Sequence, residues 1–129
     1  MKSLTKGGFI LNTIDKVRKF RAERNWQHVN MEKDLALSIN LEASELLGLF
    51  QWQSSQDAVV ANKKAMTEEL ADVIIYAYML ADNLSVDVDD IVSQKLSKNT
   101  KRYPAKELRE HPENYSHLRQ QSRNTQLKK

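Results

Sequence analysis

The sequence predicts an all-α protein, a four-helix-type bundle that assembles as an oligomer. Apolar residues recur at steps of three and four through most of its 129 residues, which is the period of a helix packed on one face. Only three glycines and two prolines interrupt this pattern, and no segment alternates apolar and polar residues as a half-buried strand would. A chain of this length corresponds to one domain.

The first two predicted helices differ in how much of their surface is apolar. The first ends at about Arg24 and has one apolar stripe. The stripe consists of Ile10, Ile14, Val17 and Phe20. After a connector over residues 25–31, the second helix runs from about Lys33 to Gln53 and has leucine on nearly every face. A helix that is apolar all round is buried, so we expect part of it to lie against another subunit, in a homodimer or a dimer of dimers.

Two further helices are predicted after a polar link over residues 54–66. Thr67 opens or continues the third helix, which runs to about Asn83 with an apolar face toward the core. Asp87 is a typical helix N-cap, so the fourth helix begins there. It has to end before Pro104, because the residue preceding a proline disfavours helical backbone.

Composition excludes several classes of protein. There is no cysteine, so disulfides, thiolate metal sites and thiol nucleophiles are absent. No apolar run approaches the roughly 20 residues of a membrane span, and the N-terminus lacks the apolar core of a signal peptide. We therefore expect a cytoplasmic protein with no membrane partner. A net charge of +3 is too small to indicate a nucleic-acid partner.

The C-terminal segment differs in charge from the rest of the chain. From Ser116 onward it has no acidic residue and four cations. These are Arg119, Arg123, Lys128 and Lys129. We interpret residues 111–129 as a flexible basic tail and residues 1–110 as the domain. A nucleic-acid-binding accessory protein that works through this tail is the alternative, which a salt-dependent affinity for nucleic acid would support.

Two pairs of acidic residues, each within an apolar helical segment, are the main functional signal. Glu42 pairs with Glu45, and Glu69 pairs with Asp72, each at a three-residue step. That step puts both carboxylates on one face of a helix, about one turn apart. If the two helices pack together, four carboxylates converge, and their repulsion and desolvation favour a bound divalent cation.

Ligation by oxygen alone suits Mg²⁺, with Mn²⁺ as the alternative. Without a metal, each carboxylate would instead pair with a neighbouring lysine or arginine, but a second acidic pair in an equally apolar segment favours a metal site. A di-iron bundle would require Glu-x-x-His on its helices. His28, His111 and His117 all lie far from both pairs, so magnesium is preferred over iron.

Three aromatic residues are candidates for holding a base. Trp26 and Trp52 could sandwich one, because stacking on aromatic side chains is the general way in which proteins hold a base. Tyr76 lies about one helical turn beyond Asp72 on the same face. Ordinary core or interface anchoring would explain both tryptophans as well.

The predicted fourth helix has a basic C-terminal half. Lys95 and Asn99 share a face of it, close to Arg102, and could reach phosphate oxygens. A solvated basic helix end, stabilised by the helix dipole, explains the same residues equally well.

In combination these residues resemble the MazG-like all-α nucleoside triphosphate pyrophosphohydrolases. The general signature is Glu-x-x-Glu followed, about two dozen residues later, by Glu-x-x-Asp. The matching segments, which look like the dCTP pyrophosphatase branch, are Phe20-Arg21-Ala22-Glu23-Arg24-Asn25-Trp26, Leu49-Phe50-Gln51-Trp52, Glu68-Glu69-Leu70-Ala71-Asp72-Val73 and Arg102-Tyr103-Pro104. The resemblance covers roughly residues 10–105.

The resemblance implies a role for each candidate residue and a reaction. Glu42, Glu45, Glu69 and Asp72 would be magnesium ligands and the catalytic carboxylates. The nucleoside pocket would be lined by Trp26, Trp52 and Tyr76, and the triphosphate would meet Lys95, Asn99 and Arg102. The implied reaction, a nucleotide-pool house-cleaning activity, is hydrolysis between the α and β phosphates to a monophosphate and pyrophosphate, in a homo-oligomer with a shared pocket. A water held by metal and a carboxylate would attack in line, and we favour Glu45 as the base.

Two positions depart from the branch. Val17 and Asn30 stand where branch members carry histidine, and both positions flank the nucleotide pocket. We therefore expect weaker cytosine preference, with dCTP and related deoxynucleotides accepted. A dUTP-type or broad pyrophosphatase is the alternative within this class, and a non-catalytic helical oligomerisation or interaction protein is the alternative outside it. Magnesium-dependent nucleotide binding would exclude the latter.

Overall fold

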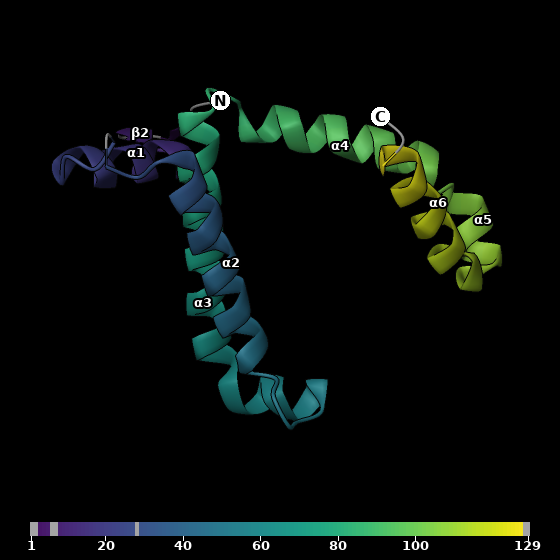
Figure 1. Cartoon of the computed structure of the whole chain (residues 1–129). Coiled ribbons are helices and arrows are strands. Elements are labelled where there is room, and N and C mark those ends of the chain that lie inside the picture. The colour runs from purple at the N-terminus through teal and green to yellow at the C-terminus, as the bar shows by residue number, and fades with distance from the viewer. Residues whose placement is uncertain (1–2, 6–7, 28, 128–129) are drawn as a thin grey trace. The chain divides into compact units, whose positions relative to one another are not determined.

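The computed structural model describes residues 3–5, 8–27 and 29–127 of the chain. The chain forms two compact units, residues 1–86 and residues 87–129 (Figure 1). The first unit contains strands β1 (Ser3–Thr5) and β2 (Gly8–Ile10) and helices α1 (Thr13–Glu23), α2 (Glu32–Gly48) and α3 (Ser55–Asn83). The second contains α4 (Val88–Arg102), α5 (Ala105–Glu110), the 3₁₀ helix η1 (Pro112–Asn114) and α6 (Tyr115–Leu127). The predicted all-α class is confirmed. None of the described helices has the length and apolar character needed to cross a bilayer.

A small antiparallel hairpin precedes the first helix and was not predicted. Strands β1 and β2 pair with Ser3 opposite Ile10 and Thr5 opposite Gly8. Strands of three residues are too short to show the alternation by which strands are recognised. Helix α1 consequently begins at Thr13 rather than near Ile10, with the Asn12 side chain accepting a hydrogen bond from the Asp15 backbone N–H at 3.0 Å.

Helices α2 and α3 run side by side in opposite directions and make up most of the first unit (Figure 1). Helix α2 ends at Gly48, earlier than predicted. The predicted link over residues 54–66 is wrong, because Ser54 caps a helix that begins at Ser55. The polar residues mark a kink instead. Asn62 leaves helical geometry (φ −125°, ψ 17°), and its side-chain amide donates to the Leu49 carbonyl at 3.1 Å.

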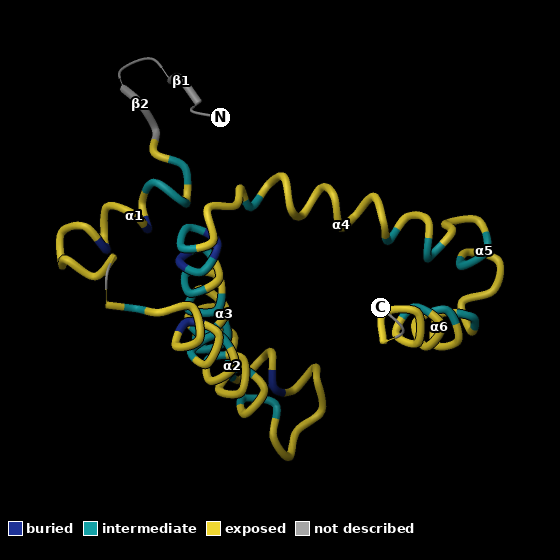
Figure 2. The backbone as a smooth tube through the Cα atoms, turned by 45° about the horizontal axis from the view of Figure 1, so that its top comes forward, coloured by how far each residue is buried: buried dark blue, intermediate teal, exposed yellow. Residues whose placement is uncertain are grey.

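The buried core is small and lies where α1 meets α2 and α3. Val17, Leu35 and Met79 form it, with half-buried residues of α3 packed around them. Much of the rest of the α2–α3 hairpin is exposed or half-buried (Figure 2). Several large apolar side chains remain exposed there. They are Leu37, Leu41, Leu47 and Val60, with 53, 60, 71 and 82% of their surface accessible.

The second unit is helical throughout the part that the structure describes. Asp87 caps α4 by accepting a hydrogen bond from the Asp90 backbone N–H at 2.9 Å, as its sequence position predicted. The rings of Tyr103 and Tyr115 lie 5.5 Å apart and connect the end of α4 to the start of α6. The segment expected to be a flexible tail thus contains a regular helix over Tyr115–Leu127. Glycine and proline are absent from Tyr115–Leu127, so nothing in that helix breaks it.

Candidate active site

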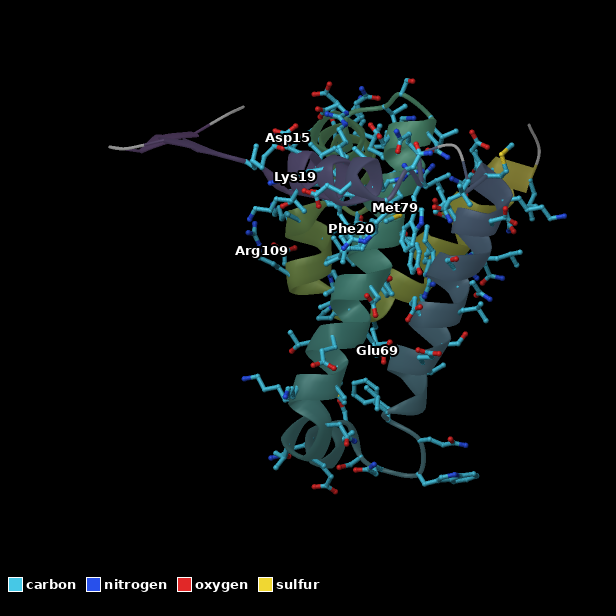
Figure 3. The ribbon with its side chains drawn as sticks, turned by 90° about the vertical axis from the view of Figure 1, so that its left-hand side faces the viewer. Asp15, Lys19, Phe20, Glu69, Met79 and Arg109 are labelled. Carbon is cyan, nitrogen blue, oxygen red and sulfur yellow. The ribbon has the colours of Figure 1, made fainter. Side chains whose placement is uncertain are left out.

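Three of the predicted carboxylates meet between α2 and α3. Glu42 comes from α2, and Glu69 and Asp72 come from α3. One carboxylate oxygen from each lies within 4.8 Å of the other two. Figure 3 shows Glu69 directed toward α2, midway along the hairpin. The antiparallel packing of two i,i+3 pairs therefore brings the acids together, as their spacing predicted.

The fourth predicted carboxylate, Glu45, is exposed and is not one of the three whose oxygens lie within 4.8 Å of one another, but it is close enough to act on Glu69. It lies one helical turn beyond Glu42 on α2. Its negative charge helps to raise the pKa of Glu69. We call Glu42, Glu45, Glu69 and Asp72 the acidic cluster.

The acidic cluster carries charge that the protein does not compensate. Burial, then interaction with Glu42 and Glu45, raises the pKa of Glu69 to about 7. Its Oε2 is buried and has no hydrogen-bond partner within the described part of the chain. No lysine or arginine among the described residues pairs with any member of the cluster. Four carboxylates without a cationic partner are a donor set that fits a hard divalent cation such as Mg²⁺.

The raised pKa of Glu69 predicts how the stability of the metal-free protein depends on pH. The folded chain holds a proton on Glu69 between pH 4.5 and about 7, whereas the unfolded chain has released it. Raising the pH through this window therefore lowers the free energy of unfolding. Thermal melts in chelator should show a Tm that falls across the window, with a shallower fall in Glu69→Gln. An identical pH dependence in both proteins would contradict the assignment.

An open groove of about 840 Å³ starts at the acidic cluster and extends toward α1. Asp72 and Tyr76, one turn apart on α3, both line it, so the groove and the cluster are continuous. The other lining residues are Thr13, Lys16, Val17, Phe20, Trp26, Val29, Asn30, Ile75 and Met79. Its floor is apolar, since Val17 and Met79 are nearly fully buried. In Figure 3, Phe20 and Met79 lie on the α1 side of Glu69.

The aromatic wall of the groove is held by packing. The rings of Phe20 and Trp26 meet edge to face at 5.7 Å, with an interplanar angle of 75°. The Arg24 guanidinium covers Phe20 at 3.8 Å from the ring centroid. Trp26 keeps 43% of its surface exposed. An apolar floor, an aromatic wall and carboxylates at one end suit a ligand with a flat ring and an anionic chain.

The groove contains only some of the predicted binding residues. Trp26, Asn30 and Tyr76 line it, whereas Trp52 does not. Trp52 follows the end of α2 with 93% of its surface exposed and a positive φ of 61°. Lys95, Asn99 and Arg102 lie on α4 of the second unit, where Arg102 lines a separate hollow between α4 and α6.

Sequence reasoning missed several lining residues. Phe20 was placed only in an apolar stripe, and Ile75 and Met79 were not singled out. Helical periodicity marks a residue as inward-facing but does not say whether it faces a solid core or a groove. Val17 and Asn30 were connected with the pocket beforehand only through the resemblance.

Comparison with known proteins identifies the family. The model of the MazG-like family matches residues 37–118, which include the whole acidic cluster. The chain belongs to the MazG-like family. This confirms the resemblance seen in the sequence.

Two mammalian relatives and one archaeal structure are similar to this MazG-like chain. Human dCTP pyrophosphatase 1 is 34% identical over 115 residues, covering 82% of this chain and 68% of the human protein. The mouse protein of the same name is 35% identical over 101 residues, covering 71% of this chain and 59% of the mouse protein. The crystal structure of a pyrophosphatase from Archaeoglobus fulgidus has a TM-score of 0.65 at 38% identity, covering 70% of this chain and 88% of that one.

Proposed function

We propose that this protein hydrolyses nucleoside triphosphates to monophosphate and pyrophosphate, with Mg²⁺ as cofactor and dCTP or related deoxynucleotides as substrates. The observation that carries this proposal is an acidic cluster at one end of an apolar, aromatic-walled groove, with no cationic partner among the residues that the structure describes. A nucleotide has matching parts, a flat base and a triphosphate that needs a metal to approach carboxylates. The names of the human and mouse relatives support dCTP as one substrate.

In this proposal each part of the chain has a defined task. Glu42, Glu69 and Asp72 would hold the cation, and Glu45 would accept a proton from the attacking water. Magnesium bound there would neutralise phosphate charge and orient the triphosphate. The water oxygen bonds to the α-phosphorus in line, the bond to the bridging α–β oxygen breaks, and pyrophosphate leaves with that oxygen. Most of the rate enhancement would come from positioning and electrostatics.

In this proposal, three residues of α4 would bind phosphate groups of the substrate. Lys95, Asn99 and Arg102 lie at four- and three-residue steps, so they share one face of the helix. An ammonium, an amide and a guanidinium are all phosphate donors. They would bind the β and γ phosphates, which leave together as pyrophosphate. A cytoplasmic location is part of the proposal.

The test is a panel of common and modified nucleoside triphosphates, assayed with magnesium for monophosphate and pyrophosphate. Stacking on Trp26 tolerates any base and is worth about 1–3 kcal/mol. Val17 offers no hydrogen bond to a base edge, which leaves Asn30 as a polar partner. We expect dCTP and other deoxynucleotides to be hydrolysed, with kcat/KM differing by less than about a hundredfold. Release of diphosphate and orthophosphate would overturn the proposed function, and a sharper base preference would overturn the account of selectivity.

We also propose that the protein is a homo-oligomer, a dimer or a tetramer. The apolar side chains exposed along α2 and α3 include Leu37, Leu41 and Leu47, each more than half accessible. Soluble monomers rarely leave such surface uncovered. In such an assembly Trp52, which is exposed and lies outside the groove of its own chain, would complete the pocket of a second copy.

The oligomer is tested by light scattering at micromolar concentration. The native mass should be two or four times the 14.9 kDa of the chain. Leu41→Glu should shift the mass toward that of a single chain, because it places a charge in the covered apolar face. Lys98→Glu, at an exposed position of α4, should leave the mass unchanged. A monomeric mass for the unmodified protein would contradict the proposal.

A further inference from the structure

Arg21, on α1, is buried to a degree unusual for an arginine. Only 1% of its surface is accessible. Its Nη1 donates to the Asn83 side-chain oxygen at 3.0 Å and to the Met79 carbonyl at 3.4 Å. The same atom lies 3.9 Å from Asp82 Oδ2. The guanidinium therefore ties α1 to the C-terminal turn of α3.

Hydrogen bonds also link Arg21 to Trp26 and Asn30, an aromatic and a polar residue of the groove wall. The backbone carbonyl of Arg21 accepts a hydrogen bond from the backbone N–H of Trp26 at 2.9 Å. Asn83, which its side chain orients, donates its own amide N–H to the Asn30 carbonyl at 2.9 Å. Trp26 is thus held by the backbone at the end of α1, and Asn30 is held by Asn83. The Arg21 side chain links both, because it ties α1 to Met79 and Asn83 of α3.

Neutralising Asp82 does not explain why an arginine is buried here. Arg18 already donates its Nε to Asp82 Oδ1 at 2.7 Å, from an exposed position. Arg21 Nε and Nη2 are buried and have no protein acceptor within the described part of the chain. Burying such donors is costly, and an apolar side chain of similar size would often be at least as stable. The remaining explanation is that the buried guanidinium fixes the position of α1 against the C-terminal turn of α3.

We infer that Arg21 and Asn83 are positioning residues that hold Trp26 and Asn30 in place for the base, an inference that rests on the proposed function. Neither residue lies in the acidic cluster, so the chemical step does not depend on them. Loss of the anchor lets the wall move away from a bound base. The affected quantity is nucleotide binding rather than the rate of the bound complex.

The decisive variant is Asn83→Asp. The carboxylate still accepts from Arg21, so the buried guanidinium keeps its partner, but it has no N–H to donate to the Asn30 carbonyl. KM should rise about tenfold for every accepted nucleotide, with kcat within about twofold of the unmodified enzyme. Arg21→Met should give the same pattern. Arg18→Met, the matched control at an exposed position that also contacts Asp82, should leave both parameters unchanged.

A second measurement does not require turnover. The chain has two tryptophans, so Trp26 is the only one in a Trp52→Phe background. In that background, Arg21→Met, which removes the tie between α1 and the end of α3, should make Trp26 fluorescence more accessible to acrylamide, whereas Arg18→Met should not. If the Trp26 signal changes but no nucleotide is hydrolysed, the inference about Arg21 stands and the proposed function is wrong. Hydrolysis with unchanged KM and an unchanged Trp26 signal, or a joint fall of kcat and Tm, would reject the anchor.

Discussion

Replacing Glu42, Glu69 or Asp72 with the corresponding amide should lower kcat by orders of magnitude and leave the helical fold intact. The amides keep the size of the carboxylates but remove the charge that would hold a divalent cation within their 4.8 Å cluster. Without that cation the triphosphate would meet carboxylates with no charge compensation. The expected loss is therefore in the chemical step as well as in binding.

The matched control is Glu68→Gln, next to Glu69 in the sequence but exposed and outside the cluster. It should keep near-normal kcat. Far-UV circular dichroism and thermal melts separate lost function from lost fold. Metal-free Glu69→Gln should melt at or above the temperature of the unmodified protein at neutral pH, because one of the mutually repelling acids is gone. Near-normal turnover in any of the three cluster variants would remove that residue from the site.

Removal of divalent cations should abolish turnover, and added Mg²⁺ should restore it, with Mn²⁺ as a second effective ion. The acidic cluster has only oxygen ligands, and it lies at the end of the groove where the triphosphate would extend. A cation that binds the folded chain also stabilises it by mass action, so Mg²⁺ should raise Tm in the absence of nucleotide.

The two readouts of metal binding check each other. In Glu69→Gln the rise of Tm with Mg²⁺ should shrink together with activity, whereas in Glu68→Gln both should persist. Calorimetry gives the affinity directly and should show binding that weakens as the pH falls below about 7, where protons compete for Glu69. Full turnover in chelator would contradict the metal site even if the substrate assignment were right.

The features that the sequence determined are local ones. Helical periodicity and the N-cap at Asp87 reflect contacts within a few residues, so most helices could be predicted from the sequence alone. The two i,i+3 acidic pairs belong to this class as well. Their convergence required one further assumption, that their helices pack together, and α2 and α3 do so. The prediction of a link over residues 54–66 was wrong because serine and asparagine occur at helix starts, at kinks and in loops alike.

The groove was decided by tertiary structure. Trp26 and Trp52 are indistinguishable as sequence signals, yet one lines the groove and the other is almost fully exposed. The difference arises because α1 packs against the end of α3, which brings Val17 and Trp26 to Tyr76, some fifty to sixty residues away in sequence. The same packing buries Arg21, which sequence reasoning treats as a surface cation. Contacts between distant segments depend on how helices pack, and no short-range pattern encodes them. Only the folded chain therefore shows which aromatic side chain shares a groove with the acids.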